Sequence, residues 1–133
     1  MNLSQRSMGM NRIINILCVL IATIVLPQAT MAEELSEQAK IEALIQTVES
    51  LTDAKFVRNG SDYNAKSAAK FLRSKWDSQR KEVNSAEDFI AVIATRSSTT
   101  GKPYLIRPKN GAETPCADFL KEQLKRIEAA AKP

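Results

Sequence analysis

The stretch KFVRNG (residues 55–60, Lys55 to Gly60) predicts a short β-strand that ends in a tight turn. Aromatic and β-branched side chains favour a strand, and Asn-Gly is a strong turn signal. A second β-favouring run, YLIR, occupies residues 104–107. Because strands this short are not stable alone, we expect Phe56-Val57 to pair with Leu105-Ile106, antiparallel and against helices. This pairing would bring the Asn59-Gly60 turn close to the polar residues 96–103.

The segments on either side of residues 55–60 have the periodicity of amphipathic helices. In residues 35–51 the apolar side chains recur at the i, i+3, i+4, i+7 spacing of one helical face, and Ser36 is the expected N-cap. After the turn, Ser61 and Asp62 offer N-caps for a second helix that we expect to reach Val83. Trp76 lies on its apolar stripe and is expected in the core.

Two further helices are expected in the second half of the chain. Ser85 is the N-cap of a short third helix, which Asp88 supports in a capping-box variant and which ends near Thr95. Thr114-Pro115 fits the N-cap and first position of a last helix. The predicted fold class is therefore α+β, mainly α, with about four helices and a small two-stranded antiparallel sheet.

Residues 1–32 have the three parts of a signal peptide. Arg6 and Arg12 precede the uncharged run 13–26, and Ala29-Thr30-Met31-Ala32 supplies small residues at a cleavage site. We expect cleavage between Ala32 and Glu33, which leaves 33–133 as a single compact mature domain in the periplasm. The alternative is an uncleaved membrane anchor, but a spanning helix needs about 20 apolar residues.

Composition limits the function classes. The formal charge falls from +4 for the whole chain to +2 for residues 33–133, because residues 1–32 carry two arginines and no acidic residue. This balance gives no argument for a nucleic-acid partner. The chain has no His, which excludes Ser-His catalysis and removes the commonest zinc ligand. We therefore predict no metal site and no cofactor, and we expect no stable membrane anchor after cleavage.

Cys116 is the only cysteine outside the predicted signal peptide. One cysteine cannot form an intrachain disulfide. The simplest interpretation is a small buried hydrophobic residue near a helix start. A reactive thiol, or a disulfide between two copies of a structural envelope protein, remains open.

The loop 96–103 carries the densest group of polar side chains that could bind a ligand. Its four hydroxyls, one Arg and one Lys, with Tyr104 beside them, could hold an anion or a glycan through charge-assisted hydrogen bonds. Together with the Asn59-Gly60 turn they suggest a non-catalytic binding or interaction module, whose partner could also be an envelope protein. The candidate binding residues are Arg58, Asn59, Gly60, Tyr63, Arg96, Ser97, Ser98, Lys102 and Tyr104.

Two alternatives to this site remain open. The loop could be purely structural, with Arg96 and Lys102 near the C-terminal end of the third helix. The protein could instead be a small cell-envelope hydrolase that uses paired carboxylates, although each candidate acid is also explained as a helix cap or first-turn residue. Those acids are Asp62, Glu87, Asp88 and Asp118.

Four stretches of the chain resemble a known bacterial family, over about residues 41–124. They are Phe56-Val57-Arg58-Asn59-Gly60-x-x-Tyr63, Ala68-Ala69-x-x-Leu72-Arg73-x-Lys75, Ser85-Ala86-Glu87-Asp88-Phe89-Ile90 and Arg96-Ser97-Ser98-x-x-Gly101-Lys102-Pro103-Tyr104. The chain resembles the YfeK-like small exported proteins, a domain-of-unknown-function family typical of Gram-negative bacteria. The resemblance implies a signal peptide and one compact domain, and it implies no activity, cofactor or partner.

Overall fold

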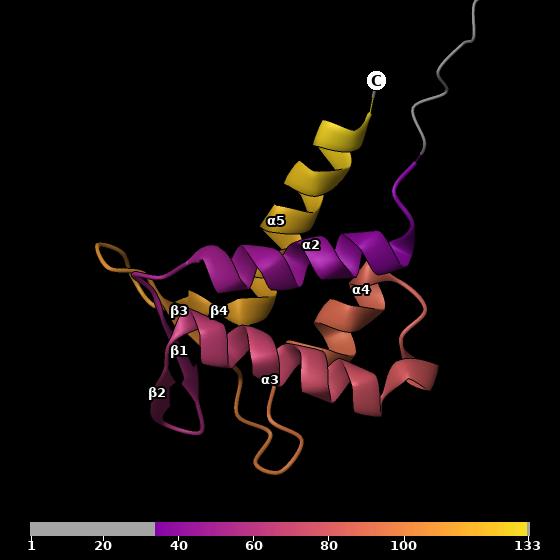
Figure 1. Cartoon of the computed structure of the whole chain (residues 1–133). Coiled ribbons are helices and arrows are strands. Elements are labelled where there is room, and N and C mark those ends of the chain that lie inside the picture. Colours follow the sequence, from indigo (N-terminus) through magenta and orange to yellow (C-terminus); the bar gives the residue numbers. More distant parts are fainter. Residues whose placement is uncertain (1–33, 133) are drawn as a thin grey trace, which may run out of the picture. The chain divides into compact units, whose positions relative to one another are not determined.

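The computed structural model describes residues 34–132 (Figure 1), so the predicted signal peptide and its cleavage site lie outside the described residues. The regular elements, in chain order, are α2 (Glu37–Ser50), β1 (Lys55–Arg58), β2 (Ser61–Tyr63), α3 (Ala65–Ser78), the 3₁₀ turn η2 (Arg80–Glu82), α4 (Ala86–Asp88), the π-helical turn η3 (Phe89–Ile93), β3 (Leu105–Arg107), β4 (Thr114–Pro115) and α5 (Cys116–Ala131). No helix within these residues is long and apolar enough to cross a membrane.

The sheet confirms the expected strand pairing and is larger than predicted. Phe56 lies opposite Ile106 and Val57 opposite Leu105, in antiparallel register. The prediction of two strands was wrong, because the sheet of the described residues has four, in the order β2-β1-β3-β4. The added strands are short and lie at the edges, where a few backbone hydrogen bonds extend the central pair.

The turn at Asn59-Gly60 explains the first added strand. Both residues have positive φ, 51° and 79°, which is the conformation of a two-residue hairpin turn of the kind that Asn-Gly favours. Ser61 and Asp62 therefore belong to β2, and their prediction as helix caps was wrong. The cap of α3 is Asn64, whose side chain accepts a hydrogen bond from the backbone N–H of Ser67 at 2.8 Å.

The third predicted helix is present but its second half is a π-helix. The Ser85 hydroxyl accepts from Asp88 N–H at 3.0 Å, which confirms the predicted N-cap. The Asp88 carboxylate accepts from Asn84 N–H rather than from Ser85 N–H, so the capping box is displaced by one residue. At the far end, the Thr95 hydroxyl donates to the Ile90 carbonyl at 2.6 Å and satisfies an acceptor that the wider helix leaves free.

Two helix boundaries differ from the prediction. The second helix ends at Ser78 and continues only as η2, so it does not reach Val83 as one helix. Thr114-Pro115 forms β4 instead of the cap of α5, because Thr114 pairs with Ile106 in the sheet. Pro115 supplies no side-chain cap, and α5 begins at Cys116.

The core lies where α2, α3, η3, α5 and the sheet meet. In Figure 1, α2 runs alongside α3, and both helices contact the elements of the core. Trp76 is buried there as predicted, edge to face with Phe89 at a centroid distance of 6.0 Å. The largest fully buried apolar side chains are Leu44, Ile45, Val48, Phe89, Ile90, Ile93 and Leu120.

Candidate functional site

A pocket of about 210 Å³ lies between the sheet and α3. Strand alternation places Phe56 and Arg58 on one face of the sheet, and the register puts Tyr63 opposite Phe56 on the same face. Ser67 and Phe71 face this pocket from α3, one helical turn apart. We call it the apolar pocket; its lining residues are Phe56, Val57, Arg58, Tyr63, Ser67, Ala68, Phe71, Leu72, Tyr104, Leu105 and Cys116.

Three side chains form one wall of the apolar pocket. The guanidinium carbon of Arg58 lies 4.3 Å from the centre of the Phe71 ring, at cation–π distance. The rings of Phe71 and Tyr104 meet edge to face with centroids 5.7 Å apart. Arg58 Nε is buried and has no hydrogen-bond partner among residues 34–132. A buried N–H without a partner costs free energy, so this guanidinium is incompletely satisfied by the protein.

A second pocket, of about 150 Å³, shares this wall. Arg58, Phe71 and Tyr104 line both pockets, so the wall divides one continuous region of the surface into an apolar and a polar half. We call the second one the polar pocket. Its remaining lining residues are Lys75, Gln79, Ser97, Ser98 and Thr99.

Lys75 is held firmly at the floor of the polar pocket. Its ammonium donates to the Arg96 carbonyl at 3.0 Å and to the Tyr104 hydroxyl at 3.2 Å. Burial lowers the pKa of Lys75, and the charge of Arg58 lowers it further. Burial also raises the pKa of Tyr104, which keeps its hydroxyl neutral. Two cations therefore share a partly buried site around a neutral phenol.

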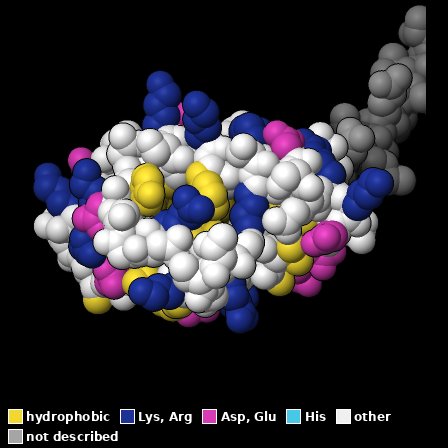
Figure 2. All heavy atoms as spheres, turned by 90° about the horizontal axis from the view of Figure 1, so that it is seen from below, with side chains coloured by type: hydrophobic (Ala, Val, Ile, Leu, Met, Phe, Trp, Pro, Cys, Tyr) yellow, Lys and Arg dark blue, Asp and Glu magenta, His cyan; other side chains and the backbone are white. Residues whose placement is uncertain are grey.

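Within the part of the chain that the structure describes, no acidic side chain pairs with either of these two cations. Among residues 34–132, neither Arg58 nor Lys75 has a carboxylate within ion-pair distance, whereas five other basic residues do. Figure 2 shows the face of the molecule that is seen from below in Figure 1, with basic and hydrophobic side chains together near its middle and the acidic ones toward its edge. The electrostatics of the site therefore favour an anion.

Hydrogen bonds join the Asn59-Gly60 turn to the loop 96–103, as the strand pairing predicted. The Asn59 amide donates to the Ser97 hydroxyl at 3.3 Å, and its carbonyl oxygen accepts from the Thr100 hydroxyl at 2.5 Å. Ser97 is only 2% exposed and its hydroxyl also contacts the Thr99 hydroxyl at 3.0 Å. These hydroxyls hold the loop in shape, so they contribute to a site mainly by positioning it.

The structure brings together only some of the predicted site residues. Tyr63, Ser97 and Ser98 each line one of the two pockets, and Arg58 and Tyr104 line both; Tyr104 is only 6% exposed. Asn59 supports the loop from the turn through its side chain, and Gly60 contributes the positive φ of the turn. Arg96 and Lys102 are exposed and line neither pocket; the contribution of Arg96 is its backbone carbonyl.

Phe71 and Lys75, two α3 residues that line the polar pocket, were not among the predicted site residues. Ser67, Phe71 and Lys75 recur every four residues, which is a second row on the helix beside the buried stripe. Phe71 is the one large apolar side chain of that row. This row can be recognised in the sequence. That it lines a site follows only from the position of α3 against the sheet, which the sequence did not predict.

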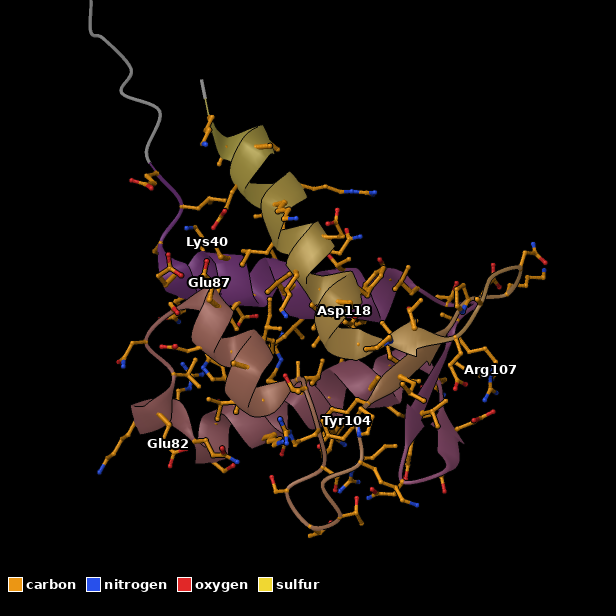
Figure 3. All side chains as sticks on the ribbon, turned by 180° about the vertical axis from the view of Figure 1, so that it is seen from behind. Lys40, Glu82, Glu87, Tyr104, Arg107 and Asp118 are labelled. Carbon is orange, nitrogen blue, oxygen red and sulfur yellow. The ribbon has the colours of Figure 1, made fainter. Side chains whose placement is uncertain are left out.

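None of the four acids of the hydrolase alternative lines either pocket: Asp62 is on β2, Glu87 and Asp88 are neighbours on α4, and Asp118 is on α5. Asp62 pairs with Arg107 at 2.9 Å, and Asp88 caps the Asn84 N–H. Figure 3 shows Tyr104 at the base of the loop 96–103, with Glu87 on α4 and Asp118 on α5 away from it. Within residues 34–132 there is also no group of three or more acidic or cysteine ligands that could hold a metal ion.

Cys116 is buried at the start of α5, as the simplest interpretation of the sequence predicted. It lines the inner end of the apolar pocket. Burial raises the pKa of its thiol to about 12, so the thiol stays protonated and unreactive at neutral pH.

Comparison with known proteins identifies the family and gives no activity. Over 89 residues the chain is 36% identical to the uncharacterized protein YfeK of Salmonella typhimurium, an alignment that covers 67% of this chain and 74% of that protein. No solved structure matches the chain. The model of a family of unknown function, DUF5329, matches residues 35–128. The chain therefore belongs to the DUF5329 family.

Proposed function

We propose that this protein is a non-catalytic binding module that holds an anionic group at Arg58 and Lys75. The observation that carries the proposal is that these two cations share a partly buried site without a carboxylate partner among the described residues. Arg58 still has donors free for hydrogen bonds, and a guanidinium can bind carboxylate or phosphate through two parallel bonds.

Electrostatics give the proposal its physical basis. Two like charges in a partly buried site lose hydration and repel one another, and the pKa of Lys75 is lowered by burial first and by the charge of Arg58 second. A bound anion removes both penalties at once. Two hydrogen bonds tie the loop 96–103 to Asn59, and this loop lines the polar pocket beside the cations. A loop that is already positioned needs little rearrangement on binding.

A titration followed by NMR tests this proposal. Inorganic phosphate or acetate, added at constant ionic strength, should shift the amide signals of Ser98 and Tyr104 in a saturable way. Arg58→Gln should weaken the binding at least tenfold, because it removes one of the two charges. Arg126→Gln is the matched control, since Arg126 is an exposed arginine of α5 that lines neither pocket.

The same pair of variants can reveal the natural ligand. The wild-type protein and Arg58→Gln are purified in parallel from the native envelope, and the small molecules bound to each are compared by mass spectrometry. A ligand present with wild type and with Arg126→Gln, but lost with Arg58→Gln, supports the proposal. Equal anion binding by wild type and Arg58→Gln contradicts it.

We also propose that the protein works in the periplasm after export. This rests on the sequence of residues 1–32, with its basic start, its uncharged run and its small residues before Glu33. Protein recovered from the periplasmic fraction of its native host should begin at Glu33. Native protein that retains residues 1–32, or that fractionates with the cytoplasm, would overturn this proposal.

A further inference from the structure

We infer that the ligand is a small amphiphilic anion, which places one ring-sized or short-chain apolar group in the apolar pocket and its charge at Arg58. This inference deepens the proposed function and rests on it. The proposed function requires only an anion at Arg58 and Lys75. The inference adds a second requirement, that binding strength comes from an apolar group on the other side of the same wall.

The chemistry of the lining supports an apolar occupant. Phe56, Leu72 and Cys116 are buried side chains that face the interior of the pocket, and Cys116 carries a neutral thiol. Tyr63, which is 38% exposed, and Ser67 lie toward the outside. Apart from Arg58, the pocket has no charged lining residue. An apolar group that enters it gains burial without desolvating a second charge.

The size of the pocket limits the occupant. An engineered apolar cavity of about 150 Å³ accommodates benzene, and the apolar pocket here has about 210 Å³. It therefore holds one six-membered ring with two or three further carbons, or a comparable short chain. Pockets for drug-sized molecules are larger, at about 300 Å³ or more. A long acyl chain does not fit within this volume.

The position of Arg58 fixes where the charge of the ligand lies. Arg58 lines both pockets, and its guanidinium stacks on Phe71 in the wall that the two pockets share. A ligand whose apolar group fills the first pocket therefore reaches the guanidinium within a few bonds. Lys75, which hydrogen-bonds to Tyr104 at 3.2 Å, adds positive potential from the other side of the wall.

A set of three matched probes tests the inference on the full protein. They are 3-phenylpropionate, which has both features, 3-phenyl-1-propanol, which lacks the charge, and acetate, which lacks the ring. Dissociation constants come from the same NMR titration. We expect 3-phenylpropionate to bind at least tenfold more tightly than either of the other probes, and to shift signals of both Tyr63 and Ser98.

Two serine variants on α3 isolate the apolar pocket. Ser67→Leu places a branched side chain in the pocket and should weaken 3-phenylpropionate binding at least tenfold, while acetate binding stays unchanged. Ser74→Leu is the matched control, because Ser74 is exposed on the same helix and lines neither pocket. Circular dichroism checks that both variants are folded. The comparison of the three probes uses the wild-type protein, so it remains valid even if a variant does not fold.

The outcomes separate the inference from the proposed function. If acetate binds as tightly as 3-phenylpropionate and Arg58→Gln weakens both, the anion site stands and the apolar subsite is wrong. If 3-phenyl-1-propanol binds as tightly as the acid, the coupling of the pocket to Arg58 is wrong. If no anionic probe shifts Ser98 or Tyr104, the proposed function fails together with the inference.

Discussion

At the scale of single residues, the properties of Lys75 depend on a neighbour from a distant part of the chain. Lys75 is on α3 and Arg58 is the last residue of β1. Burial is the larger cause of the lowered pKa of Lys75, and the Arg58 charge is the smaller one. The two side chains therefore act as one electrostatic unit, which a substitution at either position should reveal at the other.

Replacing Arg58 should raise the pKa of Lys75. Arg58→Gln removes a like charge, so the ammonium of Lys75 becomes easier to keep protonated, but its pKa should stay below the ordinary value because burial remains. NMR of reductively ¹³C-methylated lysines measures the pKa directly. Arg96→Gln is the control, because Arg96 is not a cause of the shift. An unchanged Lys75 pKa in Arg58→Gln would show that the two charges do not interact.

Cys116 should make the folded state less stable as the pH rises above 9. The thiol has a pKa of about 12 in the folded protein, against an ordinary value of 9.0. Below pH 9 both states keep the proton, and above it only the unfolded chain releases it. The folded state therefore loses about 1 to 2 kcal/mol between pH 8 and pH 10 through this group.

The Cys116 prediction is measured as a difference between two proteins. Urea unfolding of wild type and Cys116→Ala at pH 8 and pH 10 cancels the contribution of Tyr104, whose pKa is also raised by burial, because both proteins contain it. The stability advantage of wild type over the variant should shrink as the pH rises. An advantage that is constant with pH would mean that the thiol is not desolvated.

At the scale of elements, the β1–β2 hairpin organises the loop 96–103. The side chain of Asn59 makes two hydrogen bonds to that loop, and its backbone adopts the left-handed conformation of the turn. Asn59→Gly keeps the backbone conformation accessible and removes both bonds. We expect a loss of about 1 kcal/mol in unfolding free energy and faster amide hydrogen exchange at Gly101, with little change at Val57.

Gly60→Ala is the contrasting variant for this prediction. Gly60 has φ of 79° with no atom near the position of an added Cβ, so the change strains the backbone without a steric clash. It should increase exchange throughout the hairpin, including Val57. If Asn59→Gly disturbs the hairpin as much as Gly60→Ala does, the Asn59 side chain supports the turn and not the loop.

The sequence predicted the central elements and failed at short-range choices. The Phe56-Val57 pairing with Leu105-Ile106 followed from β propensity and from the instability of isolated strands. Ser61 and Asp62 suit a helix cap and an exposed edge strand equally well. Their pairing with Arg58 and Val57 of β1 makes them part of a strand. The π-helical turn could not be predicted either, because its wide ring depends on how Phe89 and Ile93 pack in the core.

At the scale of the whole molecule, η3 links the core to the surface over a few residues. Phe89 is completely buried against Trp76, while Val92, three residues later, is 36% exposed. Phe89→Ala should therefore lower the unfolding free energy by about 3–5 kcal/mol. Val92→Ala is the matched control, with an expected change within about 0.5 kcal/mol.

Urea unfolding followed by Trp76 fluorescence and by circular dichroism measures both changes. One core joins the helices to the sheet, so the two signals should coincide in a single transition for each variant. Similar losses for Phe89→Ala and Val92→Ala would contradict the placement of η3 in the core. Separate transitions for the two signals would show that the sheet and the helices unfold independently.

The candidate site was only partly predictable because it is assembled from separate parts of the chain. Arg58, Tyr63 and Tyr104 could be found near two predicted strands. Lys75 could not, since its ammonium is positioned by the Arg96 carbonyl and the Tyr104 hydroxyl, twenty or more residues away. Arg96 and Lys102 were predicted as binding residues because of their charge, but their side chains line neither pocket.

The strand order has a consequence for how a newly made chain folds. β1 can pair with β2 as soon as both have been synthesised. Its other neighbour, β3, comes much later in the chain: Val57 of β1 and its partner Leu105 of β3 are 48 residues apart. A chain stopped before Leu105 therefore carries a hairpin in which the edge of β1 that pairs with β3 is bare, and such a hairpin is unstable alone and prone to associate with other chains. Because β1 gains this neighbour only through a long-range pairing, acquisition of the native structure should be slow and should wait until β3 has been made.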